Sequence, residues 1–176
     1  TVYGNMVFAS SVPVSLHGIY EGGDRGVLHA LDQETGAVVW KFDTVDSPPG
    51  DVWGNPEVNS GGGAWFTPAI DTGRGRIYWG IANPAPFPGT PEFPNGTSRP
   101  GPNLYTDSLV ALDLRTGALD WYNQVIPRDI FDHDLIHALL VDVRQGGRAR
   151  RIAVATGKGA TVVGHAVDTG EELWRT

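Results

Sequence analysis

Oxygen-bearing side chains at three separated points of the chain could together bind a hard metal cation. Glu21 stands in a glycine-rich stretch, Asn83 precedes a proline, and Asp132 lies in an acidic run with Asp129 and Asp134. Hard divalent and trivalent cations prefer carboxylate and amide oxygens as ligands. Each residue also has an ordinary alternative, which is a solvated turn for Glu21, an Asn-Pro turn for Asn83 and an exposed acidic loop face for the aspartates.

Asp132 and Trp65 suggest a second kind of chemistry. A carboxylate that lies near a cation and is shielded from water can accept the proton of a hydroxyl group. Trp65 follows a run of glycines and offers a large flat face for stacking a fused-ring ligand, with ordinary packing inside a sheet as the alternative. The five histidines share no ligand spacing, and we assign them no role.

Composition excludes several classes of function. The 176 residues contain 20 acidic and 13 basic side chains, for a formal charge of -7, and the pI is near 5.0. This balance disfavours binding to nucleic acid or to anionic membranes. The chain has no cysteine, so disulfides, zinc-thiolate sites, iron–sulfur clusters and a thiol nucleophile are excluded. It has no run of 18 apolar residues. Because it opens at Thr1 without a methionine or a leader, we expect a removed leader or a start inside a longer protein.

Three related segments show that the chain is repetitive. Residues 30–40 and 111–121 both contain Ala-Leu-Asp, then Thr-Gly, then a tryptophan four residues after the glycine, and residues 166–174 are a degraded copy. The Thr-Gly pair interrupts each segment and the flanks alternate between apolar and polar residues, which favours a β-hairpin over a helix. In each hairpin the aspartate can accept bonds from nearby backbone amides and the glycine can take a positive φ.

Further strands between these hairpins complete four-stranded antiparallel units. Alternating segments at 64–70 and 76–81, and again at 137–142 and 151–155, predict two strands ahead of a hairpin. Residues 64–124 and 136–176 then form two units, and residues 1–43 form a third that lacks its first strand. With Trp40, Trp121 and Trp174 as packing residues, this order predicts an all-β fold, a β-propeller fragment of just under three blades. A self-contained β-sandwich would not explain the tryptophan spacing.

Residues 84–107 interrupt the second unit with seven prolines and no periodicity. An insertion of this length within a blade is typically functional or disordered. Its Phe87, Phe93 and Tyr105 favour packing over part of the molecule, and an exposed linker is the alternative.

The repeats and four further segments resemble the pyrroloquinoline quinone (PQQ) dependent alcohol dehydrogenases. The hairpins are similar to the tryptophan-docking motifs of those eight-bladed propellers. Four further segments occur in the order that they have in the family. Residues 21–26 resemble the segment whose glutamate ligates the metal, and residues 61–65 resemble the strand whose tryptophan forms the floor under the quinone. Residues 82–86 resemble the segment whose asparagine ligates the metal, and residues 127–134 resemble the segment that carries the catalytic aspartate.

The resemblance assigns a role to each candidate residue. It implies a metal site at Glu21, Asn83 and Asp132, to which Asp134 adds an oxygen at a position where lanthanide-using relatives carry an aspartate. The metal would be Ca²⁺ or a lanthanide ion, and Asp132 would also be the catalytic base. Trp65 would form the floor under PQQ, and Lys158 matches a lysine that bonds the quinone, with a surface lysine as the alternative.

The activity implied is oxidation of a primary alcohol or related hydroxyl compound by hydride transfer to the quinone. Electrons would pass to a cytochrome c-type acceptor, in the periplasm or elsewhere outside the cytoplasm. The missing blades of the same protein would complete the propeller. The alternative is a non-catalytic quinoprotein-like propeller that acts as a protein-interaction scaffold, as in outer-membrane assembly lipoproteins.

Several cofactor contacts depart from the family pattern. Gly18 replaces a serine that bonds PQQ, bulky Tyr20 replaces a small residue, and Gly63 replaces a threonine. Phe131 replaces a tryptophan beside the base, and the family's vicinal cysteine pair is absent. Because Glu21, Asn83 and Asp132 are all kept while these contacts change, the pattern favours a distant or substrate-shifted enzyme over a purely structural propeller.

Overall fold

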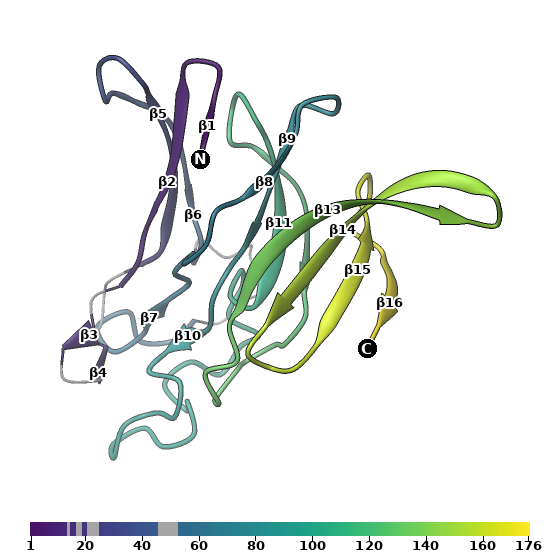
Figure 1. The fold of residues 1–176 in the computed structure, drawn as a ribbon. Coiled ribbons are helices and arrows are strands. Elements are labelled where there is room, and N and C mark those ends of the chain that lie inside the picture. The colour runs from purple at the N-terminus through teal and green to yellow at the C-terminus, as the bar shows by residue number, and fades with distance from the viewer. Residues whose placement is uncertain (14, 17–18, 21–24, 46–52) are drawn as a thin grey trace.

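The computed structural model describes residues 1–13, 15–16, 19–20, 25–45 and 53–176. Within these ranges the chain is built from strands and turns, and no helix is present that could cross a membrane. Three antiparallel sheets of four strands stand side by side, and the insertion and two short strand pairs lie together at one end of them (Figure 1). The all-β architecture predicted from the repeats is confirmed.

Each large sheet is an antiparallel meander, in which every strand is hydrogen-bonded to the strand of the same sheet that precedes or follows it in the chain. The first sheet contains β1 (Val2–Tyr3), β2 (Met6–Ser11), β5 (Val27–Asp32) and β6 (Val38–Asp43). The second contains β8 (Ala69–Asp71), β9 (Arg76–Gly80), β11 (Ser108–Asp113) and β12 (Leu119–Gln124). The third contains β13 (Leu135–Gln145), β14 (Arg148–Gly157), β15 (Val162–Ala166) and β16 (Glu172–Arg175). The short pairs are β3 (Ser15–Leu16) with β4 (Ile19–Tyr20), and β7 (Ser60–Gly61) with β10 (Pro84–Ala85).

Strand boundaries differ from the sequence expectation in three places. The first sheet has a two-residue β1 where the first strand was expected to be missing. The strand expected at 64–70 begins only at Ala69, because Pro68 has no N–H to donate and the carbonyl of Phe66 accepts a bond from Trp79 Nε1 at 2.8 Å. The strands expected at 137–142 and 151–155 extend to 135–145 and 148–157.

The Thr-Gly hairpins form as the sequence predicts. In the first, Asp32 Oδ1 accepts bonds from the backbone N and the Oγ1 of Thr35 at 2.8 and 2.7 Å, and Gly36 has a φ of +70°. In the second, Asp113 Oδ1 accepts the same two bonds from Thr116, both at 2.8 Å. The aspartate thus satisfies turn amides that no strand partner can reach.

Two tryptophans join neighbouring sheets by packing on the next hairpin. Trp40 Nε1 donates to the carbonyl of Leu114 at 3.1 Å, and a Cβ added at Gly117 would lie 2.6 Å from the Trp40 ring. Trp121 repeats this contact one sheet later, with Nε1 donating to the carbonyl of Val167 at 3.0 Å and its ring against Gly170. The predicted packing role of Trp40 and Trp121 is therefore a contact between sheets rather than within one.

The second sheet is buried on both faces. Val110 and Leu112 of β11 join one apolar cluster with the first sheet, whereas Leu109 and Ala111 join another with the third sheet. All four side chains are 0% exposed. Because successive side chains of a strand point to opposite faces, one strand contributes to both cores.

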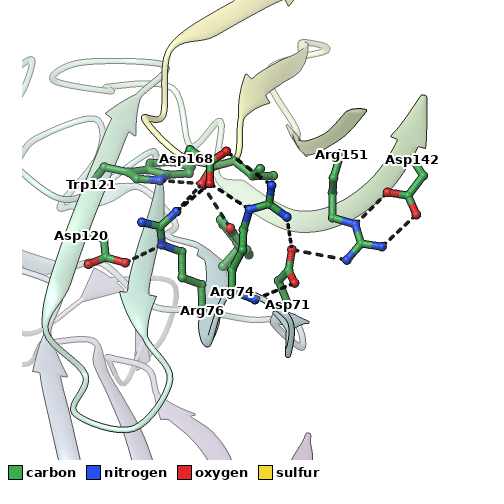
Figure 2. A network of polar contacts seen from close by, with 10 residues as sticks. Asp71, Arg74, Arg76, Asp120, Trp121, Asp142, Arg151 and Asp168 are labelled. Carbon is green, nitrogen blue, oxygen red and sulfur yellow. Dashed lines mark hydrogen bonds and ion pairs between the residues drawn. The ribbon is translucent and has the colours of Figure 1, made fainter. Parts of the chain in front are cut away.

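A chain of ion pairs also joins the second and third sheets (Figure 2). Arg74 Nε lies 2.9 Å from Asp168 Oδ1, and Arg74 also contacts Asp71 at 3.2 Å. Arg151 of β14 bridges Asp71 and Asp142 at 3.4 and 2.8 Å. The network therefore connects strand and turn residues of the second sheet with strand and turn residues of the third.

The proline-rich insertion is packed, not an exposed linker. Arg99 is 0% exposed and donates to Asn103 Oδ1 at 2.8 Å, to the carbonyl of Phe87 at 3.0 Å and to the carbonyl of Asp129 at 2.6 Å. Burial lowers the pKa of Arg99 to about 10. One buried guanidinium thus ties the insertion to the loop that carries Asp129.

Candidate functional site

The loop between β12 and β13 is shaped by the buried carboxylate of Asp129. Its Oδ1 accepts a bond from the backbone N of Phe131 at 2.8 Å, and its Oδ2 accepts one from the backbone N of His133 at 2.6 Å. His133 Nδ1 also lies 2.8 Å from Asp129 Oδ1. The loop holds Asp132 and Asp134 at φ values of +61° and +46°, which aspartate tolerates better than most residues.

Lys158 lies between the two aspartates that this loop presents. Its Nζ is 2.7 Å from Asp132 Oδ2 and 2.6 Å from Asp134 Oδ2. Burial lowers the pKa of Lys158, but hydrogen bonds from its ammonium to Asp132 and Asp134 raise it more, so the pKa lies above its ordinary value. The three residues form one charged cluster across 26 residues of chain.

Asn83 connects this cluster with the second sheet. Its backbone N donates to Asp134 Oδ1 at 3.0 Å, and its side-chain Nδ2 donates to the carbonyl of Pro84 at 2.9 Å. The side chain is buried, at 5% exposure. The contact uses Oδ1 of Asp134, whereas Lys158 contacts Oδ2, and the bond to Pro84 orients the amide whose oxygen could bind a cation.

Trp65 lies beside the cluster with an accessible face. It is 49% exposed and lines a depression of about 470 Å³ together with Phe66, Asp132, Asp134, Ile136 and Lys158. It also lines a smaller hollow with Asn83 and Gly63. A Cβ at Gly63 would lie 2.9 Å from Val12 Cγ1, so the threonine expected from the family pattern would require Val12 to shift.

The structure brings Trp65, Asn83, Asp132, Asp134 and Lys158 together. Glu21 and Gly18 lie outside the described residues, as does the side chain of Tyr20. In the part of the chain that the structure describes, no group of three or more His, Asp or Glu side chains is arranged to hold a metal ion. The described residues could supply two carboxylates, from Asp132 and Asp134, and the amide of Asn83 to a metal site, and further ligands would have to come from elsewhere in the protein.

Sequence reasoning did not single out Asp107, which is a further buried acid near the cluster. Asp107 is 0% exposed, and the backbone amide of Leu135 approaches its carboxylate without reaching hydrogen-bond geometry. Burial, with the nearby charges of Asp129 and Asp134, raises the pKa of Asp107 well above its ordinary value. The only signal in the sequence is a lone aspartate directly before a strongly apolar strand.

The donor set fits a hard cation. Both carboxylates and the buried amide present oxygen ligands, and the ammonium of Lys158 already lies between the carboxylates as a positive charge. The exposed indole of Trp65 in the same depression fits a flat aromatic ligand.

Comparison with known proteins identifies relatives along the whole chain. The sequence profile of the PQQ family described as glucose/ethanol/alcohol dehydrogenase, β-propeller domain, matches residues 1–176. The quinohemoprotein alcohol dehydrogenase of Comamonas testosteroni is 30% identical over 166 residues, which cover 83% of this chain and 22% of that protein. The quinohemoprotein alcohol dehydrogenase ADH IIB of Pseudomonas putida is 29% identical over 154 residues, covering 78% of this chain and 22% of that protein. The chain thus spans 22% of the length of each of these relatives.

Solved structures give the same result. The quinohemoprotein alcohol dehydrogenase ADHIIG from Pseudomonas putida HK5 matches with a TM-score of 0.78 at 26% identity, over 99% of this chain and 26% of that chain. A europium-containing methanol dehydrogenase matches with a TM-score of 0.80 over 99% of this chain and 32% of that chain. At 22% identity, the second match shows the shared fold alone.

Proposed function

The chain belongs to the PQQ-dependent glucose, ethanol and alcohol dehydrogenase family, and on that premise we propose that its parent protein oxidises a primary alcohol or related hydroxyl compound with PQQ and a metal ion. The observation that carries this proposal is the cluster of Asp132, Asp134 and Lys158, joined to Asn83 and facing the exposed ring of Trp65. Carboxylate and amide oxygens suit a hard metal ion, and a flat aromatic face suits the stacking of a fused-ring quinone.

Glu21, Asn83, Asp132 and Asp134 would hold the metal ion through their oxygen atoms, and the ion would be Ca²⁺ or a lanthanide. Asp134 favours the trivalent ion because it adds an anionic oxygen to the set. Asn83 and Asp134 are the buried members of the described set, and their direct contact keeps both donors in place. Trp65 would stack on the cofactor, and Lys158 would bond it.

Asp132 would act as the general base. When bound, PQQ supplies the hydride acceptor and the metal ion polarises it as a Lewis acid. The side chain of Asp132 is 35% exposed at the depression, so a substrate hydroxyl can approach its carboxylate. Asp132 would take the hydroxyl proton as the alcohol is oxidised to the carbonyl compound. Phe66 and Ile136 line the same depression and would exclude water from that proton transfer.

The electron acceptor would be a cytochrome of the c type, and the protein would work in the periplasm or elsewhere outside the cytoplasm. Support for a haem acceptor comes from the relatives, three of which are named quinohemoprotein alcohol dehydrogenases. The localisation rests on the family resemblance.

The test is reconstitution of the full-length protein with PQQ and either Ca²⁺ or La³⁺, read as alcohol-dependent dye reduction. Asp132→Asn removes the base while keeping its shape, so we expect kcat to fall by about 10² to 10⁴. Asp142→Asn is the matched control, because Asp142 is exposed on β13 and pairs with Arg151 rather than with the cluster, and its activity should equal that of the wild type. Absence of quinone binding in the wild type would overturn the proposal and favour a scaffold.

A further inference from the structure

Lys158 uses the carboxylate oxygens that a metal ion would need. Its ammonium contacts Asp132 Oδ2 and Asp134 Oδ2 at 2.7 and 2.6 Å, which are ordinary lengths for charge-assisted hydrogen bonds. Two carboxylates near each other repel unless a cation lies between them. Lys158 supplies that cation from within the chain, and a metal ion in the same place would compete with it.

The backbone around Lys158 is tied to the loop of the aspartates. Lys158 N donates to the carbonyl of Asp134 at 3.1 Å, and Gly159 N donates to the carbonyl of His133 at 3.1 Å. A Cβ at position 157 would overlap the carbonyl of Asp134, so glycine is required there for this approach. Because the backbone is fixed by these bonds, the ammonium stays within reach of both carboxylates even when its side chain turns.

The members of the cluster differ in how freely they can move. The side chain of Asp134 is 8% exposed and is also held by the backbone of Asn83, whereas the side chain of Lys158 is 48% exposed. Lysine has a flexible four-carbon side chain that ends in a strongly hydrated ammonium group. Lys158 is the most exposed of the three side chains, since Asp132 is 35% exposed, and it can leave without disturbing buried contacts.

We propose that Lys158 is a resident counter-cation, which holds Asp132 and Asp134 together until a metal ion displaces it. The inference rests on the proposed function, since it requires that the two aspartates bind metal. Lys158 keeps the ligands near their working positions, and its presence between them lowers the apparent metal affinity, because only the lysine-free arrangement can bind the ion. The displaced ammonium remains at the depression that Trp65 lines, where it can reach an oxygen of a bound ligand.

The experiment titrates the full-length protein, prepared free of metal and quinone, with Tb³⁺ alone. Luminescence sensitised by tryptophan reports binding near Trp65. Lys158→Met removes the ammonium and keeps the length of the side chain, so we expect its Kd for Tb³⁺ to be at least about tenfold lower than that of the wild type. Lys158→Arg retains the cation and should bind about as weakly as the wild type. Lys41→Met changes the other lysine of the chain, in β6, and should match the wild type.

The outcomes separate this inference from the proposed function. If Asp132→Asn and Asp134→Asn leave Tb³⁺ binding unchanged, the metal site itself is absent and both proposals fail. If those variants lose binding but Lys158→Met binds no tighter than the wild type, only the role of Lys158 is overturned.

Chemical labelling of the wild type gives a second measurement that needs no variant to fold. Amine acetylation at Lys158, followed by mass spectrometry, should become several-fold faster when Tb³⁺ is added, because the ammonium is released from its two carboxylates. Labelling of Lys41 should not change. Equal or slower labelling of Lys158 with Tb³⁺ would contradict the displacement.

Discussion

At the residue scale, two buried ionisable side chains stand out because neither reaches good hydrogen-bond geometry with a partner among the described residues. Asp107 lies near the candidate site, and His165 lies in β15 beneath Trp121, with ring centroids 6.4 Å apart. Burial of an unpartnered ionisable group favours its neutral form. Each residue therefore makes the stability of the fold depend on pH.

His165 gives a prediction with a defined pH window. Burial lowers the pKa of His165 from its ordinary value of 6.5, and this effect outweighs the backbone of Ala153 and the carboxylate of Glu172, which raise the pKa. The neutral ring stabilises the fold above about pH 6.5, and this contribution is lost as the pH falls from there through the lowered pKa. We expect wild-type stability to decline relative to His165→Leu by up to about 1.4 kcal/mol per pH unit in that window.

The measurement is chemical unfolding of both full-length proteins between pH 8 and pH 5. His29→Leu is the control, since His29 is the related position of the first sheet and is only half-buried. Parallel pH curves for the wild type and His165→Leu would show that His165 does not titrate with folding.

At the element scale, the Thr-Gly hairpin does two jobs. Within its own sheet the aspartate closes the turn, and toward the preceding sheet the glycine receives a tryptophan ring. Gly117 needs its lack of a side chain for both reasons, because its φ is +71° and the ring of Trp40 covers it. The repeat spacing predicted the hairpins, and the repeated use of the glycine explains why Thr-Gly and tryptophan recur together.

Gly117→Ala should separate these two requirements. The positive φ costs about 1 kcal/mol for alanine, and the overlap with Trp40 should add about 1–3 kcal/mol. Gly75→Ala is the matched control, since Gly75 has a φ of +65° and open space around it. The free energy of unfolding of both variants gives the comparison, and equal losses would mean that the ring does not constrain position 117.

The sequence indicated the residues of the candidate site but not the contacts between them. Trp65, Asn83, Asp132 and Asp134 were selected as candidates because they lie in segments similar to family motifs, and Lys158 because it matches a single family lysine. Which of them touch could not be predicted, since the contacts join a loop, a strand end and a turn. Phe66 and the turn-forming role of Asp129 were missed for the same reason.

At the scale of the whole molecule, the sheets are joined by tryptophan contacts, apolar clusters and the ion network of Figure 2. Asp71 is the buried centre of that network, at 1% side-chain exposure, and it contacts both Arg74 and Arg151. Burial raises the pKa of Asp71, but bonds from Arg74 and Arg151 lower it more, so the pKa lies below its ordinary value of 3.8. The network stabilises the fold above about pH 3.8 and loses this contribution as the pH falls through the lowered pKa.

Asp71→Asn should therefore destabilise the full-length protein by about 2–4 kcal/mol at neutral pH, because it leaves two guanidinium groups without their buried partner. Asp142→Asn removes the exposed partner of Arg151, at 66% exposure, and should cost less than about 1 kcal/mol. Thermal or chemical unfolding would distinguish them. Similar losses of unfolding free energy for both variants would show that burial of Asp71 does not strengthen the contact between the second and third sheets.

The sequence by itself determined the strand-and-turn repeat, the tryptophans that pack on it and the residues of the candidate site. These features follow from local rules, since turn chemistry and the period of two act between residues close in the chain. Only the tertiary structure decided that Lys158 bridges Asp132 and Asp134, that Asn83 holds Asp134 from 51 residues away, and that Arg99 fixes the insertion. Such contacts depend on how whole sheets pack, because packing sets which distant side chains come within bonding distance.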